Sequence, residues 1–500
     1  MSFDGRLRSI NKSFGLVKAN EDLNLHVRAG TIHALVGENG AGKSTAMKIL
    51  FGMVKPDSGQ VIYGQTDVTS AWNPHKAAEH GIGMVHQHFM LALTEKVHDN
   101  LVLGFETTKL GFRQRKKERK ALEELIETTG LKVPLDARVE DLPVGLQSRC
   151  EILKVLYRKA RFLILDEPTA VLTPQETEDF LKTLHLLKSR GNTLLIVTHK
   201  LKEVMKIADD ITVMRAGTTV ATRKAKDTDV EELSELMVGR KVCLPRTISK
   251  KNSATERPLF ELKTSAFHIA IQPGEIVGIG GVEGNGQDSI LEALLDPRKL
   301  EAERFTILKE NVLQYKTAQI RRLPLGIVPP DRHENGLNLS MSLTENLRLG
   351  REQCGRAGHA YFGSITASET SLLQEFDVKP PRPSLAASAL SGGNQQKLVL
   401  ARELGQLPNQ SVLIAYHPTR GVDVGSIEFI HEKILAAAAR DSAILLISSE
   451  LDELMALSHR IAVFYRGTIA RWFHGPHYDE KDIGLAMLTG GLGEKKEARL

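Results

Sequence analysis

The sequence predicts an α/β fold present in two tandem copies, each a mainly parallel sheet flanked by helices, with a helical subdomain attached. Two observations carry this prediction: related motifs recur about 250 residues apart, and short apolar runs alternate with helical patterns in both halves. The chain has 500 residues, of which 41% are hydrophobic and 25% charged, so it is long and apolar enough for two sizeable cores.

Composition also excludes several classes of protein. No apolar run approaches the roughly 18 residues of a membrane span, and residues 1–14 lack the apolar core of a secretory signal. Cys150, Cys243 and Cys354 lie far apart without CxxC spacing, which indicates free thiols rather than disulfides or a zinc site. The net charge of +5 is modest and spread along the chain, so it does not indicate nucleic-acid binding. We expect a cytoplasmic globular protein.

The internal repeat fixes the domain organisation. Asp166 aligns with Tyr416 at a separation of 250 positions (416 − 166), and Gly37 aligns with Gly281 at a separation of 244 (281 − 37). A segment rich in basic and small polar residues lies between the halves and is the natural linker. The predicted parts are a first domain over 1–240, a linker over 241–258 and a second domain over 259–500.

The elements follow from local patterns in the first half. Apolar runs at 31–37, 162–166 and 193–198 are typical of buried strands, and the pattern over 176–188 is helical. Residues between about 95 and 160 are mostly helical in pattern and interrupt the strands. We therefore expect a helical subdomain inserted in the sheet domain.

One basic run stands out within that region. Residues 113–120 read RQRKKERK and lead into the helix-like segment 121–130. Such a run can contact lipid headgroups or a membrane partner, and a solvated helix face is the plainer alternative.

Near the start of the first domain, GENGAGKST follows an apolar run and opens into a helical pattern. The spacing GxxxxGK[ST] lets backbone N–H groups wrap phosphates, while Lys43 reaches the β and γ phosphates and Ser44 is a ligand for Mg²⁺. A glycine-rich turn without a ligand is the alternative. The predicted nucleotide-binding residues here are Gly37, Glu38, Asn39, Gly40, Ala41, Gly42, Lys43, Ser44 and Thr45.

Two carboxylates end the apolar run FLILDE. Asp166 would hold Mg²⁺, directly or through water, and Glu167 would take a proton from the attacking water. His199 follows the run TLLIVT and would sense the γ phosphate, while Gln87 would link the Mg²⁺ or the water to the helical subdomain. The alternatives are a strand-end pair that faces solvent and a structural histidine.

The segment LSGGNQQKLVLAREL at 390–404 resembles the signature motif of ABC-type ATPases, and the other motifs occur in that family's order through both halves. The resemblance implies P-loop NTPase domains that meet head to tail, with each nucleotide between one domain's P-loop and the other's signature. Ser391 would start a helix, so that its hydroxyl and the N–H groups of Gly392 and Gly393 bind a γ phosphate. An ordinary helix cap is the alternative. Asp423 resembles the D-loop aspartate that reaches across the same interface.

On this resemblance, one composite site is intact and the other is degraded. Phe14 sits where the family places an aromatic ring that stacks on adenine, with a core phenylalanine as the alternative. Pro143, in the first domain's signature, supplies neither a hydroxyl nor an N–H. Losing one electrostatic stabiliser costs on the order of 10²- to 10³-fold in rate, so losing several leaves little catalysis. The altered positions of the second domain are Gln287 and Asp288 in place of Lys43 and Ser44, Tyr416 and His417 in place of the two carboxylates, and Ser449 in place of His199.

The whole chain is similar to the fused tandem ATPase subunits of bacterial importers for simple sugars and nucleosides. MVHQHFML at 84–91 and THKLKEVM at 198–205 look most like the nucleoside branch, with the ribose and galactose branch as the alternative. The resemblance implies ATP and Mg²⁺ as ligands, two transmembrane permease subunits as partners, an indirect link to an extracytoplasmic solute receptor, and peripheral attachment to the cytoplasmic face of the bacterial inner membrane. Residues 87–100 would form much of the permease-facing groove.

Two other classes remain as alternatives. A soluble ABC ATPase that does not transport usually keeps two competent sites and carries long charged linkers, which this chain lacks. A regulatory module without ATPase activity conflicts with Glu167.

The second half also departs from the family's pattern. Its opening strands look short, which puts an adenine platform there in doubt, and Pro330 stands at the expected Gln or Glu position.

Overall fold

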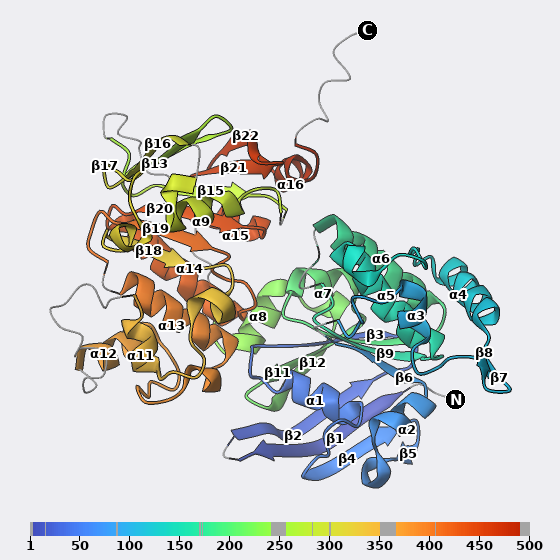
Figure 1. Cartoon of the computed structure of the whole chain (residues 1–500). Coiled ribbons are helices and arrows are strands. Elements are labelled where there is room, and N and C mark those ends of the chain that lie inside the picture. The colour runs from blue at the N-terminus through green and yellow to red at the C-terminus, as the bar shows by residue number, and fades with distance from the viewer. Residues whose placement is uncertain are drawn as a thin grey trace. The chain divides into compact units, whose positions relative to one another are not determined.

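The structure is a computed structural model, and it falls into two compact units, Met1–Val242 and Cys243–Leu500. Figure 1 shows both units, with helices and strands labelled. The residues described are 4–15, 17–86, 89–169, 172, 174–241, 257–282, 284–299, 302–350, 367–405 and 407–490.

The first unit is built around a six-stranded sheet in the order β12-β11-β3-β10-β9-β6. All neighbouring strands are parallel except β12, which runs antiparallel to β11 at the edge. The inner strands are buried, as their nearly continuous apolar sequences indicate. The strands are β3 Ile32–Gly37, β6 Ile82–Val85, β9 Phe162–Asp166, β10 Thr193–Val197, β11 Asp210–Arg215 and β12 Thr218–Lys224.

A second, antiparallel sheet in the order β2-β1-β4-β5 packs on the same unit (Figure 1). Helix α1, Lys43–Leu50, shares one apolar cluster with both sheets, because Met47 and Leu50 pack with Leu7 of β1 and Phe162 of β9. This packing fixes the start of α1 beside the end of β3. The strands are β1 Gly5–Phe14, β2 Val17–Val27, β4 Ser58–Tyr63 and β5 Thr66–Asp67.

The helical subdomain occupies the segment predicted for it, with two corrections. The basic run 113–120 does not precede the helix, because helix α4 begins within it, at Arg115. The segment also contains a short hairpin, which its helical pattern did not indicate. Leu101, Leu122 and Leu153, from three different helices, pack in one core. The elements are α3 Val97–Val102, β7 Thr108–Lys109, β8 Phe112–Arg113, α4 Arg115–Thr129 and α5 Val144–Tyr157, and the unit also has α2 Pro74–Glu79, α6 Pro174–Ser189, α7 Leu201–Ile207 and α8 Val230–Val238.

The second unit repeats this architecture, so the predicted α/β fold class is confirmed. Its main sheet runs β18-β19-β20-β15-β21-β22, again parallel except for the last strand. The strands are β15 Ile276–Gly280, β18 Leu325–Val328, β19 Val412–Tyr416, β20 Ala443–Ser448, β21 Arg460–Tyr465 and β22 Thr468–His474. The helices include α9 Asp288–Leu295, α10 Thr317–Ile320, α11 Leu343–Arg348, α12 Ala367–Glu375, α13 Gly392–Leu404, α14 Val424–Ala439, α15 Leu451–Leu457 and α16 Glu480–Thr489.

The opening strands of the second unit are short, as expected. β13, Phe260–Thr264, has 5 residues and β14, His268–Ile271, has 4, whereas β1 has 10 and β2 has 11. They complete an antiparallel sheet with β16, Ala302–Ile307, and β17, Glu310–Asn311. Across the ranges given above, no helix combines the length and apolarity that a bilayer crossing needs.

Candidate functional site

The glycine-rich loop of the first unit connects the end of β3 to the start of α1. Gly40 has φ +85° and Gly42 has φ +90°, a left-handed backbone that L side chains rarely adopt. A Cβ on Gly42 would also clash with the backbone carbonyl of Ala19. These two glycines are therefore required by the path of the loop, which presents backbone N–H groups at the start of a helix.

Lys43 is held against this loop. Its side chain is buried, and Nζ donates hydrogen bonds to the carbonyl oxygens of Gly37, at 2.7 Å, and Glu38, at 2.9 Å. Ser44 follows it and is exposed at the surface of the first helical turn. The loop thus brings together an ammonium group, a hydroxyl and a helix N-terminus, the set of groups that suits a polyphosphate.

The two carboxylates lie at the carboxyl end of β9, beside β10. Glu167 has φ +44°, which is unusual for a residue other than glycine, and its N–H donates to the carbonyl of Val197 at 2.8 Å. In the second unit His417 has φ +45° and donates to Ile447 at 2.8 Å. The strained backbone is therefore present in both units, but only the first carries a carboxylate on it.

The environment separates the acid–base properties of the two carboxylates. Burial, together with the neighbouring Glu167, raises the pKa of Asp166 to about 6. Burial also raises the pKa of Glu167, but the hydrogen bond with His199 and the nearby charges, including those of Lys43 and Lys200, together outweigh burial, and the pKa of Glu167 lies below its ordinary value. Nδ1 of His199 lies 3.0 Å from Oε1 of Glu167. Glu167 is thus kept ionised, as a proton acceptor must be, and neither carboxylate simply faces solvent.

A divalent cation fits the first unit's donor set. Asp166 is a buried carboxylate whose raised pKa indicates that the charges around it do not fully compensate its ionised form. With the hydroxyl of Ser44 it offers oxygen ligands, which Mg²⁺ prefers. Gln87, the third residue predicted at the metal, lies outside the described residues.

The signature segment of the second unit begins helix α13. Ser391 is its N-cap, and Oγ accepts hydrogen bonds from the backbone N–H of Asn394 at 3.5 Å and from its side-chain amide at 2.9 Å. The glycines that follow leave the first N–H groups of the helix uncovered by side chains. In the first unit the corresponding N-cap of α5 is Pro143, which makes no side-chain cap bond.

Asp423 has a role inside its own unit. It is buried, and Oδ1 accepts a hydrogen bond from the N–H of Ser426 at 2.8 Å, so it caps helix α14. A Cβ on Gly393 would lie 2.8 Å from Oδ2 of Asp423, which places this carboxylate directly behind the signature. Its predicted contact across an interface stays a prediction.

Phe14 is not a core residue. It ends β1 with 52% of its surface exposed, and Nζ of Lys12 lies 5.4 Å from the ring centroid. An exposed ring at this position is available for stacking on a planar base. In the short hairpin of the second unit, Phe267 is instead buried and packs edge-to-face on Phe464, with ring centroids 5.1 Å apart.

Hydrogen bonds close the second P-loop on itself. The hydroxyl of Tyr416 donates to Oδ1 of Asp288 at 2.5 Å, and Nε2 of Gln287 donates to the carbonyl of Val282 at 2.9 Å. Tyr416 and Asp288 stand where the first unit has Asp166 and Ser44. A direct hydrogen bond between two side chains therefore occupies the position that corresponds to the predicted Mg²⁺ ligands Asp166 and Ser44 of the first unit.

Sequence reasoning missed Arg332, which lies beside the signature. Its NH1 donates to the carbonyl of Arg420 at 3.0 Å and its Nε to Oε1 of Gln395 at 3.3 Å. A Cβ on Gly392 would lie 2.8 Å from NH2, so the glycine makes room for the guanidinium. The feature of the sequence that could have pointed to Arg332 is Gly392, because the first half has the larger Val144 at the same position of its signature.

We expect each chain to bind one Mg-nucleotide. The Tyr416–Asp288 bond and the missing cation at Gln287 disfavour Mg-triphosphate in the second P-loop. Equilibrium dialysis of the Glu167→Gln chain with radiolabelled ATP and Mg²⁺ measures the stoichiometry. Adding Lys43→Ala should remove the bound nucleotide, whereas adding the matched change Gln287→Ala should leave it, and two nucleotides per chain would contradict the closed second loop.

Both halves of the chain are similar to known proteins. A family model described as ABC transporter matches twice, at residues 20–170 and 264–419. Each match includes a glycine-rich loop and the strand that ends in the carboxylates or their replacements. The chain is also similar, over 48% of its length and 100% of the other chain, to the crystal structure of an ATP-binding cassette of an ABC transporter in its ADP conformation, with 25% identity and a TM-score of 0.43.

Full-length relatives are more informative about the whole chain. The nucleoside import ATP-binding protein NupA of Lactococcus lactis subsp. cremoris (strain MG1363) and the guanosine import ATP-binding protein NupO of Bacillus subtilis (strain 168) are each 39% identical to it, over 97% of this chain and 98% of theirs. The ribose import ATP-binding protein RbsA of Lactococcus lactis subsp. cremoris (strain SK11) is 35% identical over 97% of this chain and 99% of its own.

Proposed function

This chain belongs to the ABC transporter family of ATP-hydrolysing subunits, and from that premise we propose that it energises the import of nucleosides through a membrane permease. The observation that carries the choice of solute is the 39% identity to nucleoside and guanosine import subunits along both units, against 35% for a ribose import subunit. A sugar importer of the ribose type is the second candidate.

The catalytic site proposed here is composite. The first unit supplies Lys43, Asp166 and Glu167. The second unit supplies the signature from Ser391 to Gly393. What supports this is the distribution of groups: the unit with the intact loop has Pro143 at its own signature, and the unit with the intact signature has a closed loop. Phe14 stacks on the adenine and Asp423 supports the signature from behind.

Within this site each residue has a defined task. Lys43 and the loop N–H groups bind the phosphates, and the N–H groups at the start of α13 meet the γ phosphate from the other side. Glu167 accepts a proton from the attacking water, while His199 holds its carboxylate in place through the 3.0 Å contact. Ser44, Asp166 and Gln87 would hold Mg²⁺, which would supply positive charge beside the phosphates.

The proposed partners follow from the role in import. Two transmembrane permease subunits would dock on the chain, with residues 87–100 forming much of the permease-facing groove, and a solute receptor on the opposite side of the membrane would deliver the nucleoside. The chain is then a peripheral subunit on the cytoplasmic face of the membrane. No further partner, and no nucleic acid, is required by this scheme.

Uptake into proteoliposomes tests the solute. The chain, its permease subunits and the cognate receptor are reconstituted with ATP inside or outside as the orientation requires, and radiolabelled guanosine, adenosine and ribose are compared. We expect ATP-dependent uptake of nucleosides that unlabelled nucleosides suppress and ribose does not. Uptake of ribose with no uptake of nucleosides would assign the chain to the sugar branch instead.

A further inference from the structure

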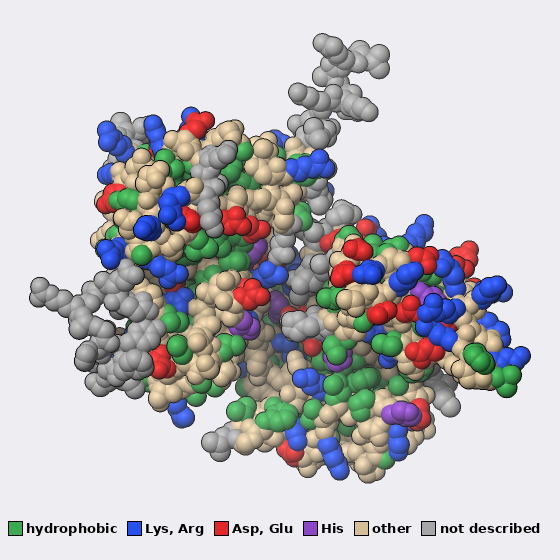
Figure 2. Space-filling view, in the orientation of Figure 1, with side chains coloured by type: hydrophobic (Ala, Val, Ile, Leu, Met, Phe, Trp, Pro, Cys, Tyr) green, Lys and Arg blue, Asp and Glu red, His purple; other side chains and the backbone are tan. Residues whose placement is uncertain are grey.

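The hairpin formed by β7 and β8 in the helical subdomain ends in exposed apolar side chains. Its strands are joined by Leu110 and Gly111. Leu110 is 89% exposed and Phe112 is 79% exposed, and we call these two side chains the apolar tip. Figure 2 shows hydrophobic side chains at this hairpin, on the right of the view, beside Lys and Arg side chains over α4.

The fold itself gives no reason for a leucine at this turn. Leu110 has φ +52° and Gly111 has φ +80°, and two-residue hairpin turns with positive φ at both positions favour Asn, Asp or Gly. A leucine is strained there. Because Leu110 buries almost none of its surface, no packing within the unit offsets the strain. The residue is therefore better explained by a contact outside the chain.

The positive charges next to the tip also lie where they do not stabilise the helix. Arg115, Lys116 and Lys117 occupy the first turn of α4, where the helix dipole disfavours cations. The acidic residue of that turn, Glu118, is buried, and the exposed acidic residues Glu123, Glu124 and Glu127 follow further along the helix. Lys109, in the hairpin, adds another cation, and within the described parts of the chain it makes no ion pair, nor do Lys116 and Lys117. We call Lys109, Lys116 and Lys117 the basic cluster.

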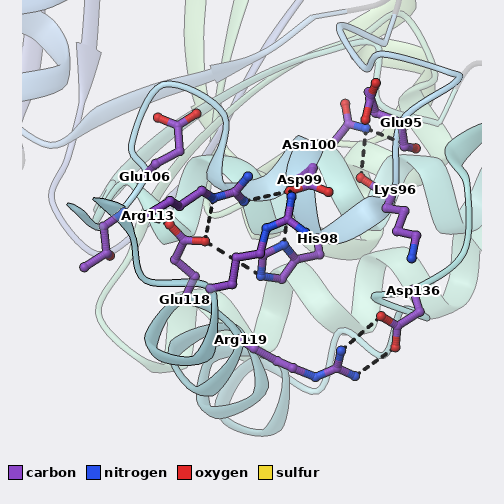
Figure 3. A network of polar contacts seen from close by, with 12 residues as sticks. Glu95, Lys96, His98, Asp99, Asn100, Glu106, Arg113, Glu118, Arg119 and Asp136 are labelled. Atoms are coloured by element: carbon purple, nitrogen blue, oxygen red, sulfur yellow. Dashed lines mark hydrogen bonds and ion pairs between the residues drawn. The ribbon is translucent and has the colours of Figure 1, made fainter. Parts of the chain in front are cut away.

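A partly buried ion-pair network holds the hairpin in place (Figure 3). Glu118 of α4 has 0% of its surface exposed. Its Oε1 accepts a hydrogen bond from the N–H of Thr107 at 2.8 Å, and its Oε2 accepts one from Nε of Arg113 at 2.9 Å. Arg113 also pairs with Asp99 of α3, at 2.7 Å. The network ties both ends of the hairpin to two helices, so the tip and the cluster are presented together.

We propose that the apolar tip and the basic cluster bind the surface of an anionic phospholipid bilayer. Apolar side chains on a convex turn need no preformed pocket in a fluid bilayer, and unpaired cations beside them match the phosphate layer. The segregation of charge along α4 orients its N-terminal end toward such a surface and its acidic end away from it. This inference depends on the proposed function only for placing the chain near a membrane.

Co-sedimentation of the full chain with vesicles tests the proposal. We expect binding to vesicles of phosphatidylcholine mixed with phosphatidylglycerol, and little binding to vesicles of phosphatidylcholine alone. Leu110→Asn should weaken binding at least about tenfold by removing an inserted side chain, without lowering the unfolding temperature, because Asn suits the turn. The triple change of Lys109, Lys116 and Lys117 to Gln should weaken binding by about fivefold for each charge.

Matched controls separate this surface from general stickiness. Leu295→Asn, at a leucine 44% exposed in the second unit, and Lys226→Gln, at an exposed lysine of the first, should leave vesicle binding unchanged. The proposal would be overturned by equal binding to both kinds of vesicle. It would also be overturned if the Leu110→Asn variant bound anionic vesicles as tightly as the wild type. Binding that requires permease subunits in the vesicle would assign the tip to a protein partner instead. ATP hydrolysis by the Leu110→Asn transporter in detergent should match that of the wild type. If the vesicle-binding proposal fails, the proposed import function is therefore not affected.

Discussion

Replacing Glu167 with Gln is expected to abolish steady-state ATP hydrolysis by the assembled transporter. The amide keeps the size of the side chain and can still hydrogen-bond His199, but it cannot accept a proton from water. General-base catalysis is worth on the order of 10²- to 10⁴-fold in rate, and we expect a loss in that range. Phosphate release from the purified transporter, with solute and receptor present, measures it.

The second unit offers matched controls for this change. His417→Gln alters the residue at the same strand end, with the same positive φ, and Gln287→Ala alters the residue at the lysine position of the second loop. Both should leave the hydrolysis rate near wild type, because the Tyr416–Asp288 bond already closes that loop. Comparable losses from Glu167→Gln and from either control would refute the model of one working site.

Replacing Ser391 with Arg should produce a loss of similar size, although Ser391 lies in the other unit from Glu167. The change removes the hydroxyl of the N-cap and places a long side chain over the N–H groups that start α13. Under the composite-site model these groups meet the γ phosphate bound by the first unit's loop. Loss of one such stabiliser costs on the order of 10²- to 10³-fold.

Loss of the cap also destabilises the helix, by about 1 kcal/mol, so unfolding must be measured alongside hydrolysis. Ser391→Ala makes the same change in capping without the bulk and should retain more activity than Ser391→Arg. Pro143→Arg, at the equivalent position of the first unit, should leave hydrolysis nearly unchanged. If Ser391→Arg hydrolyses ATP at the wild-type rate while folded, the head-to-tail assignment is wrong.

The elements and motifs of this protein follow from local sequence. The apolar runs at 162–166 and 193–198 form β9 and β10, and GENGAGKST forms a loop from a strand to a helix. The residues that determine each of these local structures are neighbours in the sequence. The sequence pattern did not indicate one element, which depends on tertiary context. The hairpin at 108–113 lies in a helical segment, and its form depends on the buried Glu118 five or more residues away.

By itself, therefore, the sequence determined the two-fold repeat, the α/β class and the residue types of both loops and both signatures. Tertiary structure alone decided which of these side chains act on one another. The contact of His199 with Glu167 joins residues 32 positions apart, the bond between Tyr416 and Asp288 joins residues 128 apart, and Arg332 meets the signature from a separate segment. Spacing along a chain fixes a local backbone, but only packing between strands and helices sets the distance and orientation of groups that lie far apart in sequence.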